Sequence, residues 1–169
     1  AIAVNLTGPM LLSHAVLPGM IKRRSGHVVN VASLASFGGP PYQETYAATK
    51  HGLLGFTRSL RASAVAEGHG VSASVVCPGF VSDAGMYHEM QRDTGVSAHG
   101  KFAASTPEQV AKAVLRAIID DEPEILVNSG ALRPLMALAS LSPRFGEWYG
   151  KRSGMLELFK QVADMRGPT

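Results

Sequence analysis

The sequence predicts an α/β fold in which helices cover both faces of a parallel sheet. Helix-like and strand-like segments alternate along the 169 residues. Each strand-like segment is a short, nearly continuous apolar run, which is typical of parallel strands buried on both faces. Only three such runs occur, which is few for a doubly wound sheet. The chain also starts at Ala1 with a helix-like segment, so we expect it to be part of a longer fold.

The three predicted strands cover residues 27–32, 71–77 and 124–127. They are short and rich in β-branched residues, and Pro78 and Gly79 break the second one at its end. Because the carboxyl ends of parallel strands lie at one edge of the sheet, the residues that follow these strands are candidates for a ligand site.

Two long helices are predicted around the first strand. The first covers 2–21 and stops at a basic run, Lys22 to Arg24, followed by glycine. Pro9 and Pro18 predict a kink in it. The second covers 45–66 and is rich in alanine and leucine.

A third helix is predicted to begin at Thr106. Thr106 suits the N-cap, Pro107 suits the first helical position, and Gln109 completes a capping box. Apolar residues at helical spacing predict the face that packs on the sheet. They are Val110, Ala113, Val114, Ala117 and Ile118.

Two segments are predicted to be less regular. Residues 82–104 are rich in methionine, glycine and histidine, which indicates a flexible loop with short helical turns. After Gly130 the chain is helical and basic to its end, with breaks at Pro134, Pro143 and Gly150.

Composition narrows the functional classes. With 46% hydrophobic and 17% charged residues the chain is globular, and its formal charge of +3 is too dispersed for a nucleic-acid surface. No apolar stretch approaches the roughly 18–20 residues that span a bilayer. Because Cys77 is the single cysteine, the chain cannot form an intrachain disulfide, which suits the reducing cytoplasm. Cys77 lies in an apolar run and is predicted to be a core residue. The six histidines show no ligand spacing, so no metal site is expected.

One group of polar residues indicates a catalytic site. Tyr46 and Lys50 lie four residues apart, on one face of the second predicted helix. Taken alone, this pair is an ordinary surface pair. Ser33, however, follows the first strand 13 residues before Tyr46, and Asn5 lies in the first helix. The rival interpretation is that Ser33 merely ends a strand and that Asn5 bonds to backbone.

Together these residues resemble the classical short-chain dehydrogenase/reductase family. The matching text is VNLTGP (4–9), LPGM (17–20), GHVVNVAS (26–33), YAATKHGLLGFTRSLRAS (46–63) and VCPGFV (76–81). The resemblance implies a Rossmann-type fold, of which this chain is the C-terminal catalytic half. It also implies NAD or NADP as cofactor, and it places the nucleotide-binding strands and their Gly-rich turn upstream of Ala1.

The resemblance also assigns roles. Tyr46 would exchange a proton with the substrate oxygen, Ser33 would hold that oxygen, and Asn5 would position a water linked to Lys50. An ordinary phenol has a pKa of about 10, and a neighbouring ammonium such as that of Lys50 favours the phenolate. The cofactor would be contacted by Tyr46, Lys50, Pro78, Gly79 and Val81.

Two features depart from the family's usual pattern. Asp83 stands where a threonine that contacts the cofactor is expected. The chain also continues for about 40 residues beyond the third strand. This extension is interpreted as helices packing on their own domain or on a partner subunit. The alternative is a helix lying on a membrane surface, because apolar and basic residues are mixed in it.

The sequence therefore predicts an oxidoreductase that transfers hydride between a nicotinamide cofactor and a secondary alcohol or ketone. Residues 1–128 would form the catalytic half, 82–104 a substrate lid, and 129–169 a helical extension. Apolar residues in the lid favour an apolar substrate: Met86, Tyr87, Met90, Val96 and Phe102.

The two long helices carry more apolar and small residues than one buried face requires, so they need a further partner. The resemblance implies that they pair with the same two helices of another subunit, which predicts a homodimer or homotetramer. The alternative is that elements upstream of Ala1 cover them within one subunit. The alternative to the enzyme is a catalytically silent fragment or a dimerising module.

Overall fold

The computed structural model describes residues 1–83, 85–96, 104–127 and 133–166. These residues form a three-stranded parallel sheet in the order β1-β2-β3. The strands are β1 (Gly26–Val31), β2 (Val71–Pro78) and β3 (Glu124–Val127). Each predicted strand is confirmed to within one residue at either end, and so is the parallel pairing.

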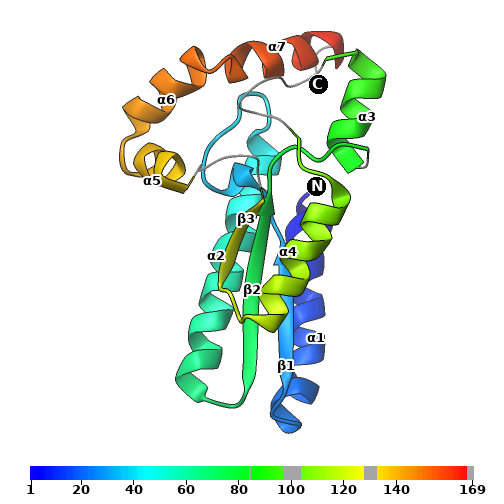
Figure 1. Ribbon diagram of the computed structural model, residues 1–169, viewed down its shortest axis with the longest axis vertical. Coiled ribbons are helices and arrows are strands. Elements are labelled where there is room, and N and C mark those ends of the chain that lie inside the picture. The colour runs from blue at the N-terminus through cyan, green and yellow to red at the C-terminus, as the bar shows by residue number, and fades with distance from the viewer. Residues whose placement is uncertain (84, 97–103, 128–132, 167–169) are drawn as a thin grey trace.

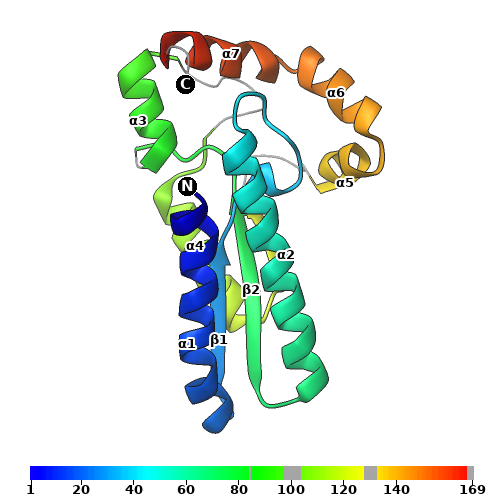
Figure 2. The same cartoon turned by 180° about the vertical axis from the view of Figure 1, so that it is seen from behind.

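Helices cover both faces of the sheet. Helix α4 (Pro107–Ile119) lies on one face, whereas α1 (Gly8–Lys22) and α2 (Glu44–Glu67) lie on the other (Figures 1 and 2). Because successive residues of a strand point to opposite faces, neighbours on β2 enter different cores. Cys77 joins a buried cluster with residues of α2, while Val76 joins one with residues of α4. The prediction of a core role for Cys77 is confirmed.

The helix predicted over 2–21 begins with a wide turn. Residues Ala3–Thr7 are π-helical, and the Gly8 N–H bonds to the carbonyl oxygen of Ala3, five residues back. Pro9 has no N–H to donate to Asn5, so the regular bonding pattern cannot continue through this point. The irregularity expected at Pro9 therefore takes the form of a π-helical segment.

The start of α4 matches its prediction in detail. The Thr106 hydroxyl oxygen accepts from the Gln109 N–H at 3.3 Å, and the Gln109 side chain accepts from the Thr106 N–H at 2.9 Å. The predicted apolar face packs on the sheet, with one exception. Ile118 is 46% exposed, because it lies at the margin of the apolar stripe in the last turn.

The prediction of an irregular segment over 82–104 is wrong for its central part. Helix α3 spans Gly85–Thr94. Tyr87 and Met90 of this helix are buried against Val162, far along the chain. These tertiary contacts stabilise a helix that the local composition does not favour. The predicted lid residue Phe102 lies outside the described residues.

Beyond β3 the chain forms three helices, α5 (Arg133–Leu141), α6 (Pro143–Arg152) and α7 (Met155–Arg166). Of the three expected breaks, only Pro143 falls at a helix boundary, as the first residue of α6. Pro134 lies in the first turn of α5, where the missing N–H of proline costs no hydrogen bond within the helix. Gly150 lies inside α6. None of the described helices has an apolar stretch long enough to cross a bilayer.

The three C-terminal helices, together with α3, arch across the carboxyl ends of the strands (Figure 1). Packing of α7 on α3 closes one side of this arch, through Tyr87, Met90 and Val162. The arch therefore lies over the edge of the sheet at which the sequence places the site.

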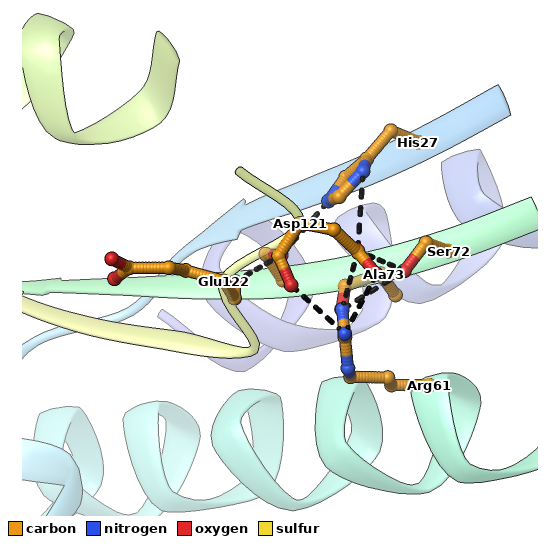
Figure 3. A network of polar contacts seen from close by, with 7 residues as sticks. His27, Arg61, Ser72, Ala73, Asp121 and Glu122 are labelled. Carbon is orange, nitrogen blue, oxygen red and sulfur yellow. Dashed lines mark hydrogen bonds and ion pairs between the residues drawn. The ribbon is translucent and has the colours of Figure 1, made fainter. Parts of the chain in front are cut away.

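A polar network joins three elements at the opposite end of the sheet. Arg61 of α2 donates to the Ser72 hydroxyl, to the Ala73 carbonyl and to both carboxylate oxygens of Asp121 (Figure 3). Asp121 lies in the turn before β3 and also accepts from Ser72 at 2.6 Å. The network thus holds α2, β2 and this turn together.

Candidate active site

Ser33 lies just beyond the carboxyl end of β1. Its backbone is extended (φ −166°), and its side chain caps the short 3-10 helix Leu34–Ser36. The hydroxyl oxygen accepts from the Ala35 N–H at 3.2 Å, and the hydroxyl is 3.4 Å from the Pro78 carbonyl, to which it donates. These bonds hold the Ser33 hydroxyl at the edge where β1 and β2 end.

Tyr46 and Lys50 lie one turn apart on α2, as predicted. The Lys50 ammonium nitrogen is 5.7 Å from the centre of the Tyr46 ring. It donates to the carbonyl oxygen of Val31, the last residue of β1, at 3.1 Å. This bond places the cation beside the end of the strand that precedes Ser33.

Burial affects the charge of Lys50. The side chain is half-buried, and this burial lowers the pKa of Lys50, against a smaller raising effect from Cys77. The ammonium therefore releases a proton more readily than that of an exposed lysine. Cys77 itself stays a protonated, neutral thiol at neutral pH, because burial raises the pKa of this thiol to about 12.

Asn5 reaches the site indirectly. Its side-chain amide donates to the Thr49 hydroxyl at 3.4 Å, and that hydroxyl donates to the Tyr46 carbonyl at 2.7 Å. Thr49 is almost fully buried. The structure therefore ties Asn5 to the turn of α2 that carries Tyr46. A link from Asn5 to Lys50 through a water stays a prediction.

The segment that follows β2 lies at the same carboxyl edge of the sheet. The Gly79 N–H bonds to the Val127 carbonyl at 3.0 Å, and Val81 pairs with Ser105 in an isolated parallel bridge. Asp83 is exposed and has a positive φ of 61°. Of the residues predicted to contact a cofactor, Pro78 thus lies beside Ser33 at the carboxyl edge, and Gly79 and Val81 follow it in the chain.

A cavity of about 660 Å³ opens at this edge. Ser33, Tyr46 and Gly79 line it, whereas Lys50 and Asn5 do not. Its volume lies within the range of about 300–1,000 Å³ that is usual for small-molecule sites. The structure thus brings Ser33 and Tyr46 to one cavity, with Lys50 beside Tyr46 and Asn5 behind α2.

Most of the cavity wall is apolar and comes from the arch. Met86, Tyr87 and Met90 of α3 line it. That residues 82–104 act as a substrate lid stays a prediction. Sequence reasoning did not place the C-terminal helices there. They contribute Leu135, Met136, Ala139, Tyr149, Leu156, Phe159 and Val162. The helical spacing of these residues shows that each helix has an inner face, but it does not show which site that face covers.

Comparison with known proteins identifies the family. A family model described as short chain dehydrogenase matches residues 1–95, which is more than half of the chain. The chain belongs to the short-chain dehydrogenase family. The resemblance seen in the sequence is therefore confirmed.

Curated members of the family share substantial identity with the chain. Ketoacyl reductase HetN of Nostoc sp. strain PCC 7120 is 39% identical over 155 residues, which cover 86% of this chain and 52% of the relative. The 2-(S)-hydroxypropyl-CoM dehydrogenase 3 of Xanthobacter autotrophicus is 36% identical, over 70% of this chain and 49% of the relative. The chain spans about half the length of the curated relatives it matches.

Solved structures show the same fold. A protein described as ElxO with NADP bound matches with a TM-score of 0.67 and 22% identity, over 78% of this chain and 56% of that one. A short chain dehydrogenase from Burkholderia cenocepacia J2315 in complex with NADP matches with a TM-score of 0.65 and 23% identity, over 89% and 56%. These matches confirm the Rossmann-type α/β fold, and their coverage agrees with the expectation of a half domain.

Proposed function

We propose that this protein is part of an NAD- or NADP-dependent oxidoreductase that interconverts a secondary alcohol and a ketone. One observation carries the proposal. Ser33 and Tyr46 come from different elements, yet both line the cavity at the carboxyl edge of the sheet. Ligands of open parallel sheets bind at this edge.

The two hydroxyls and the cation suit the proton part of this reaction. Tyr46 would donate a proton to the oxygen of a ketone, or accept one from an alcohol. Ser33 would hold that oxygen by a hydrogen bond. The Lys50 ammonium, close to the ring, would stabilise the phenolate that Tyr46 becomes. General acid-base help of this kind typically contributes about 10²–10⁴ in rate.

The residues at this edge fit the nicotinamide end of a dinucleotide. Lys50 offers charged N–H donors for ribose hydroxyls at the end of β1, and Tyr46 lies beside Lys50. Pro78 is hydrogen-bonded to Ser33 at the same edge. Hydride exchange at the substrate carbon is the chemistry that the nicotinamide supplies when it is bound.

The wall of the cavity favours an apolar substrate. Side chains from α3, α5 and α7 surround the space that Ser33 and Tyr46 face, and most of them are Met, Leu, Ala or Phe. Methionine adapts to irregular apolar shapes, which suits a long-chain or ring-bearing carbonyl compound. Glu147 and Lys151 of α6 are the ionised side chains that line this cavity among the described residues.

A substrate panel tests the proposal. Nicotinamide absorbance is followed for the full-length parent protein, because the 169-residue chain alone is expected to be inactive. The compounds are long-chain and cyclic ketones, their alcohols, and small 2-keto acids. We expect turnover with the long-chain or cyclic compounds and little with the small acids, because small acids leave most of the apolar wall unfilled. A preference for the small acids would contradict the apolar substrate.

The alternative is a catalytically silent fragment or a dimerising interaction module. Its support is the exposed apolar surface of α1, where Leu12 is 69% exposed, which suits a dimerising module. The same panel separates the two proposals. Absence of turnover with every compound and both cofactors would favour the silent module.

We also propose that the protein is a homodimer or homotetramer. Helix α1 exposes Leu11, Leu12 and Val16, with Leu12 69% exposed. On the neighbouring α2, a Cβ added at Gly55 would meet no heavy atom within 4 Å. The apolar side chains of α1 and the open surface of α2 together suit contact with the same two helices of a second subunit.

Replacing Leu12 with glutamate is expected to dissociate this oligomer, because it buries a charge in the contact. Light scattering gives the molar mass of the wild type and of the variant. The matched control is Leu115→Glu on α4, at a side chain that is 58% exposed. A wild-type monomer at micromolar concentration would contradict the proposal.

A further inference from the structure

The helices α5 and α6 each have two different sides. On α5, Leu135, Met136 and Ala139 line the cavity, whereas Leu138 and Leu141 do not. Leu138 is 47% exposed and Leu141 is 83% exposed. At 3.6 residues per turn the exposed leucines lie away from the cavity side. Two large apolar side chains therefore point out of the arch into solvent.

The outward side of α6 adds an aromatic ring between two cations. Arg144, Trp148 and Arg152 are spaced four residues apart, so they form one face of the helix. None of them lines the cavity, and all three are exposed, with Trp148 at 55%. Leu138, Leu141, Arg144, Trp148 and Arg152 together are called the outer α5–α6 surface.

Outside the cavity, the charged side chains of α5 and α6 are all positive. Among the described residues Arg144 and Arg152 form no ion pair, whereas Arg133 is already bonded to Glu124. Glu147 is the acid of these two helices, and it lines the cavity. The outer α5–α6 surface thus combines exposed leucine and tryptophan with unpaired arginine.

We infer that the outer α5–α6 surface docks on an anionic lipid bilayer. Leucine side chains would enter the acyl boundary, Trp148 would lie at the headgroup level, and the arginines would meet lipid phosphates and carboxylates. A second copy of the chain fits this surface less well. A two-fold contact brings each surface against itself, and it would set the arginines of one copy against those of the other.

This docking would place the site near its proposed substrate. The same two helices line the apolar cavity with one side and would meet the lipid with the other. An apolar substrate would therefore cross only the thickness of the arch to reach Tyr46. This consequence rests on the proposed function, whereas the docking itself does not.

The single tryptophan makes the docking directly measurable. Trp148 is the one tryptophan of the sequence, so intrinsic tryptophan fluorescence reports on this surface alone. The protein is titrated with vesicles of phosphatidylcholine, and with vesicles in which about a third of the lipid is phosphatidylserine. We expect a blue shift of the emission and co-sedimentation with the anionic vesicles, both weakened by added salt.

Variants locate the contact. Arg144→Gln and Arg152→Gln should each weaken binding to anionic vesicles about fivefold. Arg23→Gln, at an exposed cation at the far end of α1, is the control and should have no such effect. Leu141→Glu should abolish the co-sedimentation, whereas Ile119→Glu on α4, at a side chain 77% exposed, should not. Circular dichroism verifies that each variant is folded.

Three results would overturn the inference. The first is absence of binding to vesicles of either composition. The second is binding that the arginine and leucine variants do not change. The third is self-association of the protein that Leu141→Glu abolishes in the absence of lipid, which would assign the surface to a second copy. None of these measurements uses substrate or cofactor, so their outcome is independent of the proposed function.

Discussion

Replacing Tyr46 with phenylalanine is expected to lower kcat by about 10²–10⁴-fold. The change removes one hydroxyl from a half-buried ring and leaves the packing of that ring in place. Binding of an apolar substrate should change little, since the ring remains, so the loss falls on kcat more than on KM. Steady-state kinetics give both constants, and thermal unfolding verifies the fold.

The neighbouring Tyr42 supplies a matched control. It lies four residues before Tyr46, in the turn that precedes α2, is 48% exposed and does not line the cavity. Tyr42→Phe should therefore retain wild-type kcat. A second control is Tyr149→Phe, which removes a hydroxyl from another tyrosine of the same cavity. Tyr149 belongs to α6 and not to the carboxyl edge of the sheet, so this variant should also retain kcat. Equal kcat values for Tyr46→Phe and the wild type would remove the assignment of Tyr46 as general acid and base.

Replacing Arg61 with alanine is expected to lower the free energy of unfolding by about 3 kcal/mol, because hydrogen bonds to a charged group contribute more than neutral ones. The guanidinium makes bonds of 2.8–3.0 Å to Asp121, to Ser72 and to the Ala73 carbonyl. Its side chain is only 19% exposed, so water cannot fully replace these bonds. Urea denaturation of the two proteins measures the difference.

Arg58 is the control for this prediction. It lies on the same helix, almost one turn before Arg61, and its ion pair with Glu124 is short, at 2.6 Å. The Arg58 side chain is 55% exposed, however, and Glu124 keeps a second cation in Arg133. Arg58→Ala should therefore lower the free energy of unfolding by about 1 kcal/mol or less. Equal losses in the two variants would show that the network at Asp121 adds no stability beyond an ordinary surface pair.

The same network includes His27, whose ring nitrogen Nδ1 lies 3.8 Å from an Asp121 carboxylate oxygen (Figure 3), and it predicts a loss of stability in acid. Burial lowers the pKa of His27 below its ordinary 6.5, so below that pH the unfolded chain takes up protons more readily than the folded chain. Bonds from Arg61 and Ser72 lower the pKa of Asp121 below its ordinary 3.8. The free energy of unfolding should therefore fall as the pH drops below about 6.5, and fall again below about 4. His27→Gln should flatten the first of these two steps.

The order of elements follows from local patterns in the sequence. Continuous apolar runs of four to eight residues predict buried parallel strands, because a strand covered on both faces has no polar side. The cap at Thr106 follows from a three-residue spacing that satisfies two free N–H groups. The positions of Ser33 and Tyr46 relative to the strand ends follow from the same reasoning, because strand ends and helix starts are local features.

The enclosure of the site was decided by the tertiary structure. Helix α3 forms where composition predicts a loop, since Tyr87 and Met90 are buried against Val162, more than 70 residues away. That Leu135 and Phe159 face the same cavity as Tyr46 depends on the path of three helices across the sheet. A helical repeat shows that a helix has an apolar side, but only long-range packing determines what that side covers. By itself, the sequence determined the fold class and the residues of the candidate site, and the packing of α3 and α5–α7 decided what surrounds them.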